Sequence, residues 1–92
     1  MAAFSPNPFR TGAAGRIAFT MAREGKARID VFDLNGRLVN TIFDGTAKEG
    51  ENEATWNGND ATGRAVAAGV YFYRMDAAGK TMSKKMVVVR GR

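Results

Sequence analysis

The apolar residues of this chain occur in short runs, each ended within a few residues by a glycine or a polar turn. The chain holds 11 glycines in 92 residues, and no stretch between them shows the apolar period of 3.6 residues and the end caps of a helix. Ile17, Phe19 and Met21 instead alternate with Ala18 and Thr20, the period-2 pattern of a half-buried strand. The sequence therefore predicts a protein built from strands.

Turn signals divide the rest of the chain into further strands. Asn35-Gly36 lies between two β-rich runs, and both residues tolerate the positive φ of a type I′ turn, so we expect a hairpin there. A polar loop bounded by Asp44-Gly45 and Glu49-Gly50 should follow, and a turn over residues 77–80 should close a last hairpin. The expected strands include residues 17–21, 27–33, 38–43, 53–56, 70–76 and 81–90.

These elements predict one all-β domain over residues 1–92. About seven short strands in a chain of this length are typical of an antiparallel β-sandwich, immunoglobulin-like or fibronectin III-like. Pro6 and Pro8 fix φ and remove hydrogen-bond donors, so residues 1–15 should form an extended lead-in and residues 16–90 the sandwich.

The penultimate strand carries the spacing of a tyrosine corner. Tyr71 lies two residues before the inward-facing position of Tyr73, so its hydroxyl should hydrogen-bond the backbone upstream. Tyr71, Tyr73 and Met75 should then point into the core, and Phe72 and Arg74 should face outward.

Cysteine and histidine are absent from the chain. Their absence excludes disulfides, thiolate metal sites and Ser-His or Cys-His catalysis. The acids lie mostly at turns or on strand exteriors, and a chain this small has little room for a deep cleft, so we expect no enzyme and no cofactor. The N-terminus lacks the basic start and apolar run of a signal peptide, so we expect an excised domain whose upstream part supplies any export signal.

The charge balance is basic, with 14 Lys and Arg against 9 Asp and Glu and a net charge of +5. The basic residues that follow the last acid, Asp76, are Lys80, Lys84, Lys85, Arg90 and Arg92. Such a tail fits a solvated edge strand, whose lysines discourage aggregation, or a contact with an anionic envelope component. Nucleic acid is not expected, because the arginines are dispersed and the aromatic-basic alternation of an RNA-binding sheet is missing.

A metal site is a further possibility for the loop after Trp56. Asn57, Asn59 and Asp60 offer oxygen atoms with a superficial likeness to a calcium site. Calcium takes about six to eight oxygen ligands, however, and the same side chains equally well form Asx-turns in a tight loop. We expect no metal, with these three residues as the candidates if one binds.

Carbohydrate binding is open as well, because small β-sandwiches can stack sugars on exposed aromatic side chains. Phe32, Phe43 and Phe72 are the candidates for exposure, since Trp56 should be largely buried and both tyrosines are expected in the core. A saccharide site would therefore rest on phenylalanines.

Several segments together carry a resemblance to a known family. They are Pro6-Asn7-Pro8-Phe9, the run Val31-Phe32-Asp33-Leu34-Asn35-Gly36-Arg37-Leu38-Val39, the loop Trp56-x-Gly58-x-Asp60-x-x-Gly63, Gly69-Val70-Tyr71 and a lysine-rich last strand. In this order and spacing they resemble the type A C-terminal sorting domain of type IX secretion and the related immunoglobulin-like domain of the flagellar hook-capping protein. The resemblance covers Pro6 to Arg90, and only Gly91-Arg92 extend beyond the family's usual last basic residue.

The resemblance implies a non-catalytic C-terminal module of a larger secreted hydrolase or adhesin, exported through the periplasm and attached at the cell surface. The implied partners are the outer-membrane secretion and attachment machinery, anionic lipopolysaccharide and the upstream domains of the parent protein. The residues that match the family's motifs are Pro6, Asn7, Pro8, Gly36, Gly69, Tyr71, Lys84, Lys85, Val87, Val88, Val89 and Arg90.

The hypothesis for recognition is that the last hairpin presents its main-chain edge and its basic side chains to a receptor groove. The alternative for each residue is structural: the glycines permit turns and the valines fill the core. A sorting module should be a monomer in isolation, whereas a hook-cap-like assembly domain should self-associate.

Overall fold

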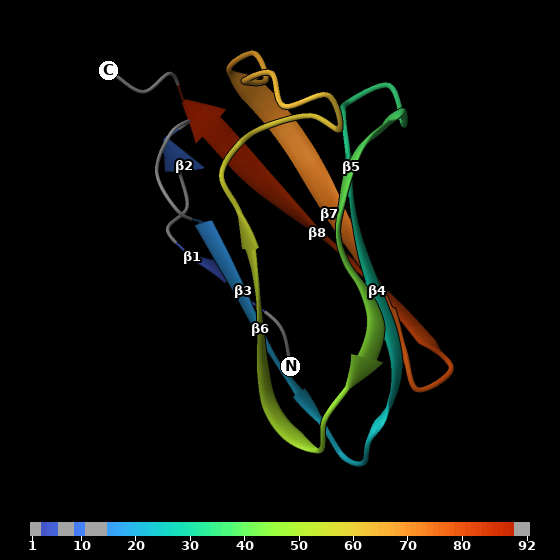
Figure 1. Cartoon of the computed structure of the whole chain (residues 1–92). Helices are drawn as coiled ribbons and strands as arrows, with labels where there is room; N and C mark the ends of the chain where they lie inside the picture. The colour runs from blue at the N-terminus through green and yellow to red at the C-terminus, as the bar shows by residue number, and fades with distance from the viewer. Residues whose placement is uncertain (1–2, 6–8, 11–14, 90–92) are drawn as a thin grey trace.

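The computed structural model describes residues 3–5, 9–10 and 15–89, with side chains over residues 15–89. The described residues form eight strands in two sheets that face each other (Figure 1). The smaller sheet has the order β1-β3-β6 and contains β1 (Ala3–Ser5), β3 (Gly15–Met21) and β6 (Gly50–Trp56). The larger has the order β2-β8-β7-β4-β5 and contains β2 (Phe9–Arg10), β4 (Gly25–Phe32), β5 (Leu38–Ala47), β7 (Gly69–Ala77) and β8 (Lys80–Val89).

Neighbouring strands run antiparallel except β2 and β8, which pair in parallel over two residues. The predicted all-β immunoglobulin-like sandwich is confirmed. Within the described ranges, no helix is long and apolar enough to cross a membrane.

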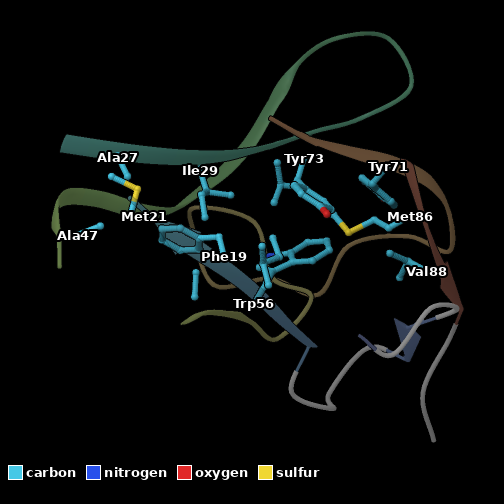
Figure 2. Close-up of a cluster of buried hydrophobic side chains, with 13 residues drawn as sticks. Phe19, Met21, Ala27, Ile29, Ala47, Trp56, Tyr71, Tyr73, Met86 and Val88 are labelled. Atoms are coloured by element: carbon cyan, nitrogen blue, oxygen red, sulfur yellow. The ribbon is translucent and has the colours of Figure 1, made fainter. Parts of the chain in front are cut away.

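The core lies between the two sheets and takes its side chains from alternating positions of both (Figure 2). In β3, Ile17, Phe19 and Met21 are buried while the residues between them are exposed, as the period-2 pattern predicts. Trp56 is 2% exposed, which confirms its predicted burial. The buried apolar residues of the described chain are Ile17, Phe19, Met21, Ala27, Ile29, Val31, Ala47, Ala54, Trp56, Tyr71, Tyr73, Met86 and Val88.

Two short connections carry the chain from one sheet to the other. Residues 22–24 lead from β3 to β4, and residues 48–49 lead from β5 to β6. Strands that follow each other in sequence therefore do not pair at these two places: β3 pairs with β6, and β4 pairs with β5 and β7. Both connections lie at the same end of the sandwich (Figure 1).

The hairpin predicted at Asn35-Gly36 is confirmed, since β4 and β5 pair, but the predicted type I′ turn is wrong. Among the described residues of this turn, Gly36 has a positive φ of 82° and Asn35 does not. The Gly36 amide donates to the Asp33 carbonyl at 3.0 Å, and the Asp33 carboxylate accepts from the Asn35 amide at 2.9 Å. The Asp33 side chain thus stabilises a turn in which only the glycine leaves the negative-φ region.

Two consecutive residues with positive φ, as a type I′ turn requires, occur instead between β7 and β8. Ala78 has φ of 54° and Gly79 has φ of 75°. This two-residue turn joins strands that stay in one register from Gly69↔Val88 to Ala77↔Lys80. The predicted last hairpin is confirmed, and its turn is the kind that matches the twist of paired strands.

The polar loop predicted between Asp44-Gly45 and Glu49-Gly50 is mostly strand. Asp44 lies in β5 opposite Arg28, and an Arg28–Asp44 ion pair at 3.7 Å spans the two strands. Gly50 already pairs with Met21, so β6 begins before the predicted residue 53. Cross-strand pairing overrides the turn tendency of these polar and glycine residues.

Candidate functional site

The predicted recognition residues within the described chain lie on the larger sheet and its loops. Gly36 is in the β4–β5 turn, Gly69 and Tyr71 are at the start of β7, and Lys84, Lys85 and Val87–Val89 are on β8. Because β7 runs antiparallel to both β4 and β8, Gly36, Gly69 and Val88 come to the same end of the sheet. Pro6, Asn7, Pro8 and Arg90 lie outside the described residues, as do Gly91 and Arg92.

Tyr71 forms the predicted tyrosine corner. Its hydroxyl donates a hydrogen bond to the Ala67 carbonyl oxygen at 2.7 Å, and its ring packs at an angle against Trp56 with centroids 6.0 Å apart. Burial raises the pKa of the Tyr71 hydroxyl above its usual 10.0, and the nearby Asp33 carboxylate adds to the shift. Tyr71 therefore ties the long β6–β7 connection to the core.

The predicted faces of β7 are confirmed. Tyr71 and Tyr73 are buried and Met75 packs against the core, whereas Arg74 is exposed. Phe72 lies on the outward face and is half-buried. Burial also raises the pKa of the Tyr73 hydroxyl above 10.0.

The two lysines of the last strand lie on opposite faces of the larger sheet. Lys84 is the register partner of Tyr73, whose side chain points into the core, and Lys85 is the partner of the outward-facing Phe72. Both lysines are exposed, including Lys84 on the face that carries the core residues. The sequence feature Lys84-Lys85 is therefore a pair of cations that straddles one strand.

The three valines that follow differ in environment. Val88 is 1% exposed and belongs to the core, Val87 points outward and is 37% exposed, and Val89 is half-buried. The structural interpretation thus holds for Val88, while Val87 contributes to the surface.

One edge of β8 carries no partner among the described strands over Lys80–Met86. On its other side β8 pairs with β7 along its length, and β2 pairs with it in parallel only at Val88 and Val89. The opposite edge of the sheet is β5, whose pairing with β4 shifts register at two places. Among the described strands, this edge of β8 is thus regular and unpaired over Lys80–Met86, in contrast to an edge disrupted by bulges.

Two loops of the chain share one five-residue pattern that the sequence reasoning missed, Asp-x-x-Gly-Arg at residues 33–37 and 60–64. In each, the Asp amide donates to the Arg carbonyl, at 2.9 Å in the first loop and 2.8 Å in the second. In each, the Gly amide donates to the Asp carbonyl at 3.0 Å. The repeat of aspartate, glycine and arginine at equal spacing is the signal that could have revealed it.

The aspartate side chains close both loops in the same way. Asp60 Oδ1 accepts from the Thr62 amide at 2.9 Å, the Thr62 hydroxyl at 2.7 Å and the Arg64 amide at 3.1 Å. Asp33 Oδ1 accepts from the Asn35 and Arg37 amides, each at 2.9 Å. The hydrogen bonds from Thr62 and Arg64 lower the pKa of Asp60 below its usual 3.8.

Oxygen atoms of the candidate metal loop accept hydrogen bonds from other groups of the protein. The Asn59 carbonyl accepts from Trp56 Nε1 at 2.8 Å and from the Asn40 side-chain amide at 2.9 Å, and Asp60 caps its own turn. The described part of the chain contains no group of three or more His, Cys, Asp or Glu side chains placed to hold a metal ion. At Asp60 the geometry is that of an Asx-turn, the alternative that the sequence left open for this loop.

The three phenylalanines proposed for sugar stacking divide between the two faces of the sheet. Phe43 packs edge-to-face against Phe19 with centroids 5.5 Å apart, so the expectation that it is an exposed candidate is wrong. It faces the core because its register partner is the buried Ile29. Phe32 and Phe72 are half-buried register partners on the outward face.

A charged network adjoins these two phenylalanines. Asp30, 2% exposed, accepts from Arg28 Nε at 3.1 Å and from the Thr41 hydroxyl at 2.7 Å. Arg74 lies 3.9 Å from Asp30 and 3.4 Å from Asp76. The network satisfies Asp30, a buried carboxylate that the alternating pattern placed outside.

Comparison with solved structures finds this fold in other bacterial proteins. A domain of PorZ of Porphyromonas gingivalis, described as an essential bacterial surface component of the type IX secretion system, is 27% identical with a TM-score of 0.69 over 97% of this chain and 11% of that chain. FlgD of Pseudomonas aeruginosa is 22% identical with a TM-score of 0.60 over 82% of this chain and 58% of that chain.

A third structure shares the fold alone. The DNA glycosylase AlkC of Pseudomonas fluorescens is 14% identical with a TM-score of 0.55 over 96% of this chain and 29% of that chain. The present chain thus spans 11% to 58% of the length of these three proteins, as one domain among others.

No curated protein matches the sequence significantly. The sequence model of the FlgD Ig-like domain matches residues 5–81, which include six of the eight strands in full and the start of β8. This match agrees with the sandwich, the tyrosine corner and the structural likeness to PorZ and FlgD. The chain therefore belongs to the FlgD Ig-like domain family.

Proposed function

We propose that this domain is a non-catalytic C-terminal sorting and surface-attachment module of a larger secreted hydrolase or adhesin. In this proposal the type IX secretion machinery at the outer membrane recognises it after passage through the periplasm. The similarity to PorZ over nearly the whole chain supports a link to that machinery.

The open edge of β8 is the observation that carries the proposal. Over Lys80–Met86 the main-chain groups on the side of β8 away from β7 have no partner among the described strands, and the pairing of β8 with β7 holds one register throughout. An extended receptor segment can add to such an edge through main-chain hydrogen bonds, while side chains of alternating faces supply specificity. The edge therefore suits recognition by strand addition.

Lys84 and Lys85 set the chemistry of the expected receptor segment. A strand added beside β8 would have one ammonium group near each of its faces, because the two lysines lie on opposite sides of the sheet. Carboxylates on both faces of the added strand would complement them. The proposed receptor segment is accordingly acidic and extended, and anionic lipopolysaccharide is the proposed surface partner after export.

The test joins residues 1–92 to a fluorescent reporter behind a periplasmic signal peptide, in a type IX-competent bacterium and in an export-machinery deletion strain. The double variant Lys84→Glu/Lys85→Glu reverses both charges while keeping the buried Val88. It is preferable to deletion of residues 87–92, which also removes core. Protease accessibility of the reporter reports surface display.

The matched control is Lys26→Glu/Lys48→Glu, an equal charge change at two exposed positions away from the β8 edge. We expect display of the parent and the control only in the competent strain, and periplasmic retention of the β8 variant. Equal surface display of both variants would contradict recognition through the β8 edge. Retention of the parent domain itself would contradict sorting.

A hook-cap-like assembly role is the second candidate, favoured by the family match and by the likeness to FlgD. It requires contacts between copies of the domain or with a growing appendage. Light scattering of the purified domain separates the two candidates, because an assembly module should self-associate and a sorting module should remain a monomer.

A further inference from the structure

The outward face of the larger sheet carries an apolar surface where polar residues are the norm. Phe72 lies at its centre, with Phe32 as its partner on β4 and Lys85 as its partner on β8. Val70 and Val87 form the next row toward the loop end, and Arg74 and Ser83 form the row on the other side. We call Phe32, Val70, Phe72, Arg74, Lys85 and Val87 the Phe72 face.

The apolar part of the Phe72 face remains in contact with solvent. Phe32, Val70 and Phe72 are half-buried, and Val87 is 37% exposed. The outward positions of a solvated sheet are ordinarily polar, and a contiguous apolar area rimmed by polar groups marks a binding surface. The face is made from three adjacent strands in regular register.

Arg74 is held in place beside this surface. Its guanidinium lies 5.1 Å from the centroid of the Phe32 ring, and its nitrogens lie 3.4 Å from Asp76 and 3.9 Å from Asp30. Asp30 is in turn fixed by Arg28 and Thr41. A cation ordered before binding loses less conformational entropy when a ligand arrives.

The apolar rings and basic side chains of the Phe72 face indicate which class of ligand it could bind. The Phe72 ring offers an apolar surface between two basic residues: Lys85 on the neighbouring strand, and Arg74 along the strand, which is ion-paired with Asp76 and Asp30. A pyranose has an apolar ring face, and an acidic pyranose adds an anion that Arg or Lys can pair with. We propose that the Phe72 face binds an anionic saccharide, with the sugar ring on Phe72 and its acidic groups at Lys85 and Arg74.

Other occupants fit less well. A symmetric pair of copies packed through this face would bring four cations, Lys85 and Arg74 of each copy, into one interface. A stable protein interface takes about 20–30 residues from each side, far more than this face supplies. A saccharide of a few units matches its size. The inference does not depend on the sorting role.

The experiment titrates the purified domain with hexagalacturonate, and with neutral cellohexaose at equal concentrations, while amide shifts are followed by NMR. We expect shifts confined to Phe72, Arg74, Ser83, Lys85 and their neighbours, with hexagalacturonate only. Phe72→Ala should weaken binding by about tenfold, and Lys85→Gln by about threefold. A phosphorylated or sulfated hexasaccharide in a third arm tells whether carboxylate is required or any anion suffices.

Lys84→Gln is the matched control, because it removes the same charge one residue away on the opposite face of β8. It should leave the affinity within the error of the parent. Equal weakening by Lys84→Gln and Lys85→Gln would overturn the site in favour of diffuse attraction to a basic protein. Shifts outside the Phe72 face, equal binding of cellohexaose, or concentration-dependent broadening of these amides without ligand would also overturn it.

Discussion

Trp56 and Asn40, on strands of different sheets, donate hydrogen bonds to one acceptor. The indole Nε1 of Trp56 lies 2.8 Å from the Asn59 carbonyl oxygen, and the Asn40 side-chain amide lies 2.9 Å from the same atom. Asn59 is in the connection from β6 to β7, so both sheets hold this loop at one point. Tyr71 holds the same connection again at Ala67.

Trp56→Phe should destabilise the domain by about 2–3 kcal/mol, because it removes the indole hydrogen bond and leaves a cavity in the core. Urea unfolding followed by far-UV circular dichroism measures the change. Asn57→Ala, at the exposed neighbouring position, is the control and should change stability by less than about 0.5 kcal/mol. Comparable losses for the two variants would contradict the role given to Trp56.

Tyr71→Phe removes the hydroxyl that bonds Ala67 and should cost about 1–2 kcal/mol of folding free energy. The matched comparison is Phe72→Tyr, which adds a hydroxyl at the adjacent outward position and should leave stability nearly unchanged. An unaltered unfolding midpoint for Tyr71→Phe would show that the corner hydrogen bond adds no stability.

The pKa values of Tyr71 and Tyr73 are both raised by burial. Their contribution to stability is therefore complete below the unfolded value of about 10 and is lost as the pH rises through the folded values, because the unfolded chain releases these protons first. We expect the free energy of unfolding to fall above about pH 10. The fall should be shallower in Tyr71→Phe, and equal slopes for the two proteins would argue against the shift at Tyr71.

Ala78→Asn should stabilise the domain by about 0.5–1 kcal/mol, because Asn tolerates the left-handed conformation better than Ala and Asn-Gly favours a type I′ turn. Ala78 has φ of 54° there. Thermal unfolding measures the gain. The control is Ala22→Asn in an exposed turn without positive φ, and a gain shared by both variants would indicate a general effect of surface polarity.

Gly36→Ala and Gly63→Ala test the two Asp-x-x-Gly-Arg loops together. Their φ values are 82° and 93°, and an added Cβ would meet no atom within 4 Å at either site, so the cost is backbone strain of about 1 kcal/mol each. Gly45→Ala, equally open but without positive φ, should be neutral or slightly stabilising. Destabilisation by Gly45→Ala as large as that of the other two would refute the strain argument.

The strands and their faces could be predicted because period-2 alternation follows directly from backbone geometry. The tyrosine corner followed from the spacing of Tyr71 and Tyr73, which places a hydroxyl at a fixed distance from the strand start. The type of the Asn35-Gly36 turn could not be predicted, because it depends on hydrogen bonds that the Asp33 side chain accepts from the Asn35 and Arg37 amides.

The sequence predicted which residues make up the candidate site better than where the fold places them. Lys84 and Lys85 were identified from their place in the last strand, and alternation puts them on opposite faces. The open edge of β8 depends on the order of strands in the sheet, which local sequence does not encode. The inward position of Phe43 could not be predicted, because register shifts in the β4–β5 pairing interrupt the alternation of β5. The recognition roles of all these residues, Pro6, Asn7, Pro8 and Arg90 included, stay predictions.

The two short connections between the sheets, residues 22–24 and 48–49, lie at one end of the sandwich, whereas the long β6–β7 connection lies at the other (Figure 1). The two sheets are therefore joined closely at one end of the domain and by a long loop at the other. We expect partial unfolding to separate the sheets first at the loop end, where side-chain hydrogen bonds hold the long connection, so amide exchange there should be faster than beside the two short connections.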